Sequence, residues 1–159
     1  MPANPLQPEQ AARRRWMAVL ARAGVAELEA AWHTLAAPPA FQWLRKPETG
    51  LAMLRGRAGG SGVKFNLGEA SLTRCALRSL DAPGGGNTGV AYVLGRSHRH
   101  AELAAQFDAL LQDAAWRASI QRGVIARLAA AQEARRDAAS RKAAATRVDF
   151  YTLVRGENP

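Results

Sequence analysis

Apolar residues at helical spacing mark the first part of the chain. Pro8 is typical of a helix start, because its missing amide hydrogen would be unpaired there in any case, and Trp16 begins an apolar stripe. A second helix is predicted around Leu28, and it must end before Pro38, which cannot donate to the helical hydrogen-bond ladder. We therefore expect residues 8–37 to be helical.

A pattern of strands and turns replaces the helical pattern over residues 40–96. Turn residues are concentrated in the segments PETG (47–50) and GGSG (59–62), and residues 63–67 alternate between apolar and polar, as in a half-buried strand. Gly68 interrupts this alternation, and we interpret it as a β-bulge. Consecutive strands joined by short connections predict a mostly antiparallel sheet.

Helical spacing returns over residues 98–145. Ser97 can cap the first of these helices, and the pattern breaks around Gly123. The stretch from 124 to 145 has strong helix formers but few large apolar residues, so we expect it to lie exposed or against a partner. The apolar positions of the first helix are Leu103, Phe107, Leu110, Leu111 and Ala114.

The last segment, residues 147–159, alternates again and is predicted to form a final strand followed by a tail. It is apolar on both faces, which indicates that another surface covers it. Together these patterns predict one domain over residues 1–159 of the α+β class, with N-terminal helices, a central mostly antiparallel β-sheet, C-terminal helices and a final strand.

The charge of the chain indicates an anionic partner. The formal net charge is +9, and nearly all of the positive charge is on arginine, which binds carboxylates and phosphates. Nucleic acid, a nucleotide triphosphate and an acidic protein surface therefore all remain open as partners. The arginines at 13–15 and the basic residues at 135–142 are mixed with acidic residues and lack interleaved aromatics, so we expect solvated faces or subunit contacts.

The chain shows neither a secretory leader nor an apolar run long enough to span a membrane, so we expect it in the cytoplasm. The lone cysteine, Cys75, excludes an internal disulfide framework and a multi-cysteine metal site, and we expect it to be a small buried thiol.

Candidate chemistry is sparse. His98, His100 and Glu102 could in principle hold a metal ion, but residues two apart on a helix face different directions. Arg96 and Arg99 flank the same helix start, where free amides could bind an anion. The glycine-rich segments match no nucleotide-binding loop, and hairpin turns account for them. We predict no catalytic residue and no metal site on this chain.

Four segments together resemble the PhnG family, the G subunit of the bacterial carbon–phosphorus lyase core complex. Their order and spacing cover most of the chain, although Ser97 stands where the family usually has aspartate. The segments are RRRWMAVLA (13–21), ETGLAMLRGRAGGSGVKFNLGEASLTRC (48–75), GVAYVLGRSHRHAELAAQFDALL (89–111) and TRVDFYTLVRGEN (146–158).

This resemblance implies a non-catalytic subunit in phosphonate breakdown. The family's complex transfers methylphosphonate to the ribose of ATP with release of adenine, giving alpha-D-ribose 1-methylphosphonate 5-triphosphate. The partners implied are PhnH-, PhnI- and PhnJ-type subunits. The resemblance places the iron–sulfur cluster and S-adenosylmethionine on a partner subunit and no cofactor on this chain. The alternative is a basic nucleic-acid-binding module.

The resemblance and the charge pattern also select residues for partner or anion contacts. Each could equally form a structural ion pair. These candidates are Glu48, Arg74, Arg96, His100, Glu102, Asp149 and Arg155.

Overall fold

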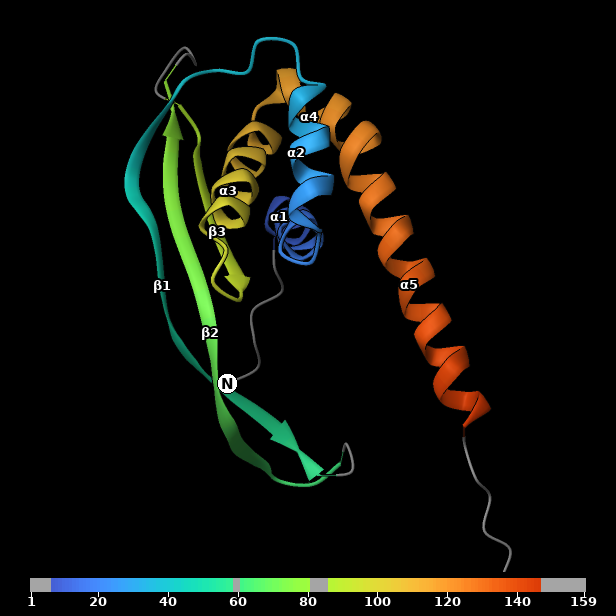
Figure 1. Ribbon diagram of the computed structural model, residues 1–159. Helices are drawn as coiled ribbons and strands as arrows, with labels where there is room; N and C mark the ends of the chain where they lie inside the picture. Colours follow the sequence, from blue (N-terminus) through green and yellow to red (C-terminus); the bar gives the residue numbers. More distant parts are fainter. Residues whose placement is uncertain (1–6, 59–60, 81–85, 147–159) are drawn as a thin grey trace, which may run out of the picture.

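The computed structural model describes residues 7–58, 61–80 and 86–146, and it has the expected α+β architecture (Figure 1). The elements follow the order predicted from the sequence within these ranges, and the predicted final strand and tail at 147–159 lie outside them. They are α1 (Pro8–Leu20), α2 (Val25–His33), β1 (Phe41–Arg57), β2 (Lys64–Ser79), β3 (Thr88–Leu94), α3 (His98–Gln112), α4 (Ala114–Ile120), the π-helical turn η2 (Gln121–Ile125) and α5 (Ala126–Ala145).

The sheet of the described residues is antiparallel, with the strand order β1–β2–β3. Strand β1 runs through Pro47 without a turn, so the interpretation of PETG as a turn was wrong. Register shifts between Trp43 and Glu48 accommodate the proline, which has no amide hydrogen for the ladder and is tolerated on an edge strand. The predicted bulge at Gly68 is confirmed by the register shift opposite Leu54 and by a φ of 144°.

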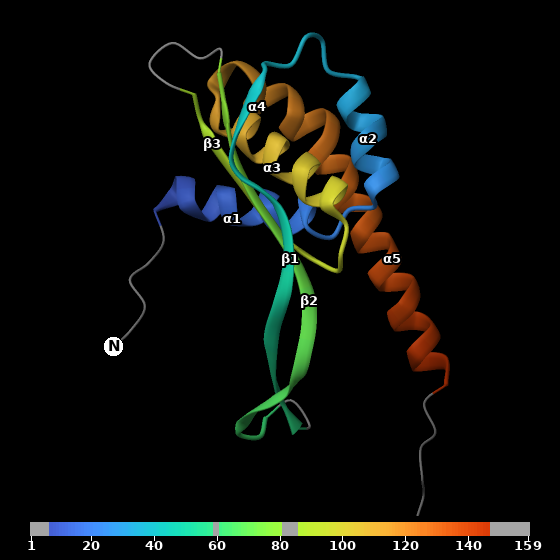
Figure 2. The same cartoon turned by 60° about the vertical axis from the view of Figure 1, so that its left-hand side comes forward.

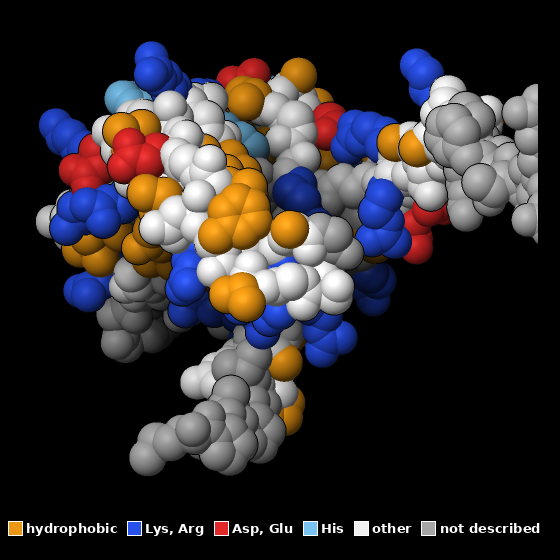
Figure 3. Space-filling view, turned by 90° about the horizontal axis from the view of Figure 1, so that it is seen from below, with side chains coloured by type: hydrophobic (Ala, Val, Ile, Leu, Met, Phe, Trp, Pro, Cys, Tyr) orange, Lys and Arg blue, Asp and Glu red, His pale blue; other side chains and the backbone are white. Residues whose placement is uncertain are grey.

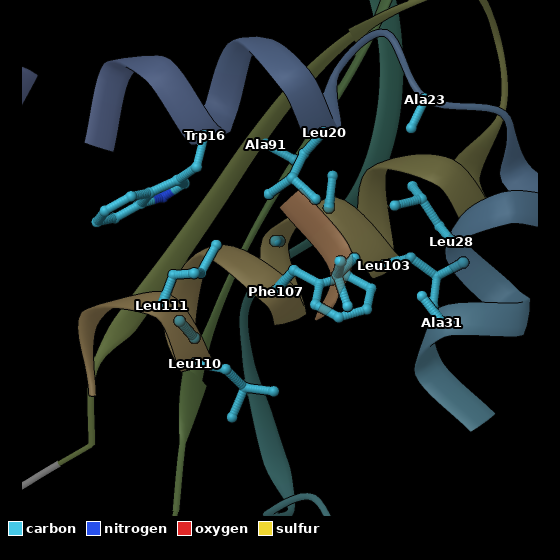
Figure 4. Packing of buried hydrophobic residues seen from close by; sticks show 14 of the residues in the cluster. Trp16, Leu20, Ala23, Leu28, Ala31, Ala91, Leu103, Phe107, Leu110 and Leu111 are labelled. Carbon is cyan, nitrogen blue, oxygen red and sulfur yellow. The ribbon is translucent and has the colours of Figure 1, made fainter. Parts of the chain in front are cut away.

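Helix α3 packs on one face of the sheet, and α1 and α2 lie on the other side of α3 (Figure 1). Ser97 caps α3 as predicted, since its side chain accepts a hydrogen bond from the amide of His100 at 3.2 Å. Phe107 is fully buried at the centre of the core, between residues of α2 and α1 (Figure 4). Its ring meets that of Trp32 edge to face, with 5.5 Å between centroids.

A buried carboxylate joins three of these elements. Asp108 of α3 is fully buried and accepts hydrogen bonds from Arg13 at 3.1 and 2.7 Å and from Trp16 Nε1 at 2.9 Å. The backbone amide of Val90 in β3 donates to it at 3.0 Å. The expectation of a solvated face is therefore wrong for Arg13, because its guanidinium neutralises a charge inside the protein.

The helical region from Ala114 to Ala145 continues through Gly123, where the sequence pattern predicted a break. The residues Gln121–Ile125 form a π-helical turn instead, which shifts the helix face by one residue and lets Val124 and Ile125 enter the core. As expected, α5 beyond this point is mostly exposed, and Leu128 is its one buried residue.

The β1–β2 hairpin extends well beyond α1–α4 in both views of the ribbon, and α5 runs in the same direction at a distance from it (Figures 1 and 2). The prediction of a half-buried strand at 63–67 is correct for the strand of 64–67 but wrong for its burial. Val63, Phe65 and Leu67 are 89, 47 and 61% exposed, because no helix of the described part reaches this end of the sheet. None of the described helices has the length and apolarity needed to span a membrane.

Candidate partner-binding surface

The projecting part of the hairpin, which we call the arm, comprises residues 50–57 of β1 and 64–71 of β2. The arm begins where β3 ends, since β3 pairs only with residues 72–78 of β2. Two threonines tie its base together: Thr49 Oγ1 lies 2.9 Å from Thr73 Oγ1, and Thr73 donates to the carbonyl of Gly95 at 2.7 Å. The base of the arm is thus held rigidly by the body.

Large apolar side chains are exposed along the whole arm. A two-stranded ribbon with apolar side chains in water is only marginally stable alone, and a contiguous exposed apolar patch usually marks an interaction site. The exposed fractions are 66% for Leu51, 51% for Met53, 41% for Leu54, 47% for Phe65 and 61% for Leu67.

The face of the sheet opposite the helices, which we call the outer face, continues this apolar surface onto the body. Leu94 lies directly opposite Leu72 in the register, and Tyr92 lies opposite Arg74. Tyr92 and Leu94 are 54 and 66% exposed, and no described element covers them. Leu72, Arg74, Tyr92 and neighbouring residues of β1 line a hollow of about 370 Å³.

Glu48 and Arg74, two of the predicted contact residues, meet at this hollow. Glu48 Oε1 accepts hydrogen bonds from Arg74 Nε at 2.7 Å and from Arg45 Nη1 at 2.6 Å. The hydrogen bond from Arg45, followed by that from Arg74, holds the pKa of Glu48 below its ordinary value. The trio is exposed, so it contributes little to stability but presents an ordered charged edge beside apolar side chains.

Basic residues accompany the apolar ones near the tip. Arg55, Arg57 and Lys64 are all exposed, and the single acidic residue of the described arm is Glu69. Figure 3, seen from the tip side, shows hydrophobic side chains gathered in the middle of the face with more Lys and Arg than Asp and Glu around them. The surface therefore suits a partner that is apolar and acidic.

The other predicted contact residues have separate surroundings. Arg96 Nε donates to Ser71 Oγ at 3.3 Å, at the base of the arm. His100 is buried, and its Nε2 lies 2.9 Å from the carbonyl oxygen of Leu20. Glu102 pairs with Arg99 at 3.1 Å. Asp149 and Arg155 lie outside the described residues.

The helix start around Ser97 shows no grouping for the metal site considered from the sequence, and one of its two flanking arginines is paired with carboxylates. The residues that the structure describes contain no group of three His, Cys, Asp or Glu side chains placed to hold a metal ion. Arg99 is paired with Glu29 at 3.2 Å as well as with Glu102, so its charge is already balanced.

Cys75 is buried, as expected, and its thiol donates to the carbonyl of Ala101 at 3.1 Å. Burial raises the pKa of the Cys75 thiol to about 12, and the nearby charge of Glu102 adds to the rise. With one cysteine in the chain, and that one neutral and enclosed, the residues do not fit an iron–sulfur cluster.

Sequence reasoning missed the arm because alternation was taken as evidence of burial. A signal was present: residues 51–54 read Leu-Ala-Met-Leu, which places apolar residues on both faces of the strand. Such a strand must be covered on both faces, and the predicted helices could cover only one.

Two comparisons with known proteins agree on the chain's relatives. Residues 11–156 match the family model described as "Phosphonate metabolism protein PhnG". A protein of Rhizobium meliloti (strain 1021), named alpha-D-ribose 1-methylphosphonate 5-triphosphate synthase subunit PhnG, is 48% identical over 151 residues, which cover 93% of this chain and 92% of that protein. Neither comparison supports the nucleic-acid-binding alternative.

Proposed function

Because the chain belongs to the PhnG family of phosphonate metabolism proteins, we propose that it is a subunit of an alpha-D-ribose 1-methylphosphonate 5-triphosphate synthase. In this role the arm attaches the chain to the other subunits. The observation that carries the proposal is the row of apolar side chains exposed along the arm and the outer face. Leaving this surface in water would be unfavourable, and burial against a partner removes that penalty.

The chain serves assembly, and the chemistry takes place on its partners. Its buried carboxylate and buried imidazole are committed to structure: Asp108 to Arg13 and Trp16, and His100 to the carbonyl of Leu20. PhnH-, PhnI- and PhnJ-type subunits are the proposed partners in a cytoplasmic complex. ATP, the iron–sulfur cluster and S-adenosylmethionine bind to those partners.

The reaction proposed for the assembled complex transfers methylphosphonate to the ribose of ATP and releases adenine. In this exchange the C1′–N bond to adenine breaks as a C1′–O bond to the phosphonate forms, and the proton of the phosphonate hydroxyl is transferred to the departing adenine. The contribution of this chain is to hold the catalytic partners in the arrangement that binds both substrates.

Co-expression tests this proposal. The tagged chain is produced with the PhnH-, PhnI- and PhnJ-type subunits of its own source, and the complex is isolated by affinity and size-exclusion chromatography. Co-elution of all subunits is expected, with adenine release from ATP and methylphosphonate that requires the chain. The chain alone should release no adenine. Elution of the chain by itself beside an assembled, active complex would refute the proposal.

A further inference from the structure

The two faces of the arm differ in chemistry, as the strand register shows. Residues directly opposite each other in an antiparallel pair lie on the same face, and faces alternate along each strand. Thr73, which is fully buried under the helices, lies opposite Thr49 and fixes the helix-side face. Leu51, Met53, Arg55 and Arg57 follow Thr49 at two-residue intervals and continue that helix-side face along the arm.

The outer face of the arm is apolar up to the tip. Leu54 is two residues after Ala52, and the next outer position, Gly56, lies opposite Phe65. A Cβ on Gly56 would lie 2.5 Å from Leu67 Cδ1, so the leucine covers the glycine. Leu54, Phe65 and Leu67 therefore form one outer stripe that leads toward Leu72 and Leu94 on the body.

The helix-side face of the arm is mixed near its base and basic near its tip. Leu51 and Met53 are exposed there opposite Ser71 and Glu69, and Arg55 and Arg57 follow, with Lys64 opposite Arg57. Both faces of the arm thus carry groups that a partner would bury or neutralise. If the arm docked onto a single flat surface, the exposed groups on its other face would remain in water.

The edges of the hairpin resist strand addition. Pro47 and two register shifts interrupt β1 just before the arm, and within the arm the bulge at Gly68 interrupts β2 and Arg55, Arg57 and Lys64 carry charges. Bulges, proline and charged side chains are the usual means by which edge strands avoid pairing with other strands. The partner is therefore expected to contact side chains on the two faces and not to extend the sheet.

We propose that the arm inserts into a groove of a partner subunit whose walls are apolar and whose region around the arm tip is acidic. The inference rests on the proposed function, because it describes how the arm of that function is held. The apolar walls slow dissociation, and the acidic region draws in Arg55, Arg57 and Lys64 and speeds association.

Photo-crosslinking tests the groove directly. A benzoylphenylalanine residue replaces Phe65 on the outer face or Met53 on the helix-side face in the co-expressed complex, and Arg14 on α1 in the control. We expect both arm positions to crosslink to one partner subunit, at peptides from opposite walls of one groove. Crosslinks from only one face, or to a second copy of this chain, would overturn the inference.

Association kinetics test the acidic region. The probe is the complex of the other subunits prepared without this chain. Arg57→Glu is expected to lower the association rate about tenfold at low salt, and the difference should shrink as salt is added. The matched control, Arg14→Glu, makes the same charge change at an exposed position of α1 and should stay within about twofold of the wild type. Equal association rates for the two variants would show that the partner has no acidic region around the arm tip.

The outcomes of these experiments distinguish a failure of the groove proposal from a failure of the proposed function. If the wild-type chain fails to join the other subunits, the proposed function itself fails. If the wild type joins them while Phe65 and Met53 reach unrelated surfaces or Arg57→Glu behaves like its control, the function stands and the groove is wrong.

Discussion

At the scale of single residues, the fold depends on a buried ion pair that the helix pattern does not reveal. Asp108 occupies the face of α3 that meets α1 and β3, and its carboxylate is fully hydrogen-bonded there. Replacing such a pair by apolar groups can be neutral, but removing the buried partner leaves the guanidinium of Arg13, which is 34% exposed, without its carboxylate. The contact thus fixes how α1 sits on the rest of the molecule.

Asp108→Ala should therefore be strongly destabilising. The change leaves Arg13 and the indole amine of Trp16 without their acceptor. Because water can reach Arg13 in part, we expect the free energy of unfolding to fall by about 2–4 kcal/mol. Urea unfolding followed by circular dichroism measures the change. Asp137→Ala, at an exposed position of α5, should shift it by less than about 0.5 kcal/mol, and similar losses for both variants would contradict the account.

Cys75 should be inert in the folded protein. Its pKa of about 12, against an ordinary value of 9.0, keeps the thiol neutral at physiological pH. An aromatic disulfide reagent at pH 8 should react with it in urea and not under native conditions. Because the unfolded thiol loses its proton first, stability should fall as the pH rises from about 9 to 12, and Cys75→Ala should lack this component. Rapid native labelling would show that the thiol is accessible.

At the scale of the elements, the close approach of β3 to α3 is what brings sheet and helix together. Gly89 of β3 permits it, since a Cβ there would lie only 1.9 Å from the carbonyl oxygen of Ala105. Backbone atoms cannot yield as a flexible side chain can. The position therefore requires glycine for space and not for an unusual φ.

Gly89→Ala should separate the two elements and lower the free energy of unfolding by about 2 kcal/mol or more. Gly50→Ala is the matched control, because a Cβ at Gly50 meets no heavy atom within 4 Å. Thermal unfolding of the two variants compares them. A Gly50→Ala loss as large as that of Gly89→Ala would show that the cost comes from glycine replacement in the sheet and not from the contact with α3.

The elements were largely predictable from the sequence, whereas their mutual contacts were not. Local signals place the helix start at Pro8, the cap at Ser97 and the bulge at Gly68, because each depends on neighbouring backbone groups. The pair of Arg13 and Asp108 joins residues 95 apart, and no local pattern encodes it. The exposure of Phe65 depends on where the helices end relative to the sheet, which periodicity does not specify.

At the scale of the whole molecule, the body and the arm have different tasks. The body is closed by α1, α2 and α3 over one face of the sheet, and its core is well packed (Figure 4). The arm has no described helix over it and exposes the apolar residues that a stable monomer would bury. We therefore expect the arm to be dispensable for folding and essential for assembly.

Shortening the arm tests this separation most directly. Residues 53–69 are replaced by Asn-Gly, so that Ala52 and Ala70, which lie directly opposite each other, flank a two-residue hairpin turn. Unfolding of the isolated variant and its co-purification with the PhnH-, PhnI- and PhnJ-type subunits are then measured side by side with the full chain. We predict a free energy of unfolding within about 1 kcal/mol of that of the full chain, together with loss of co-purification. A folded variant that still enters the complex as the full chain does would contradict this prediction.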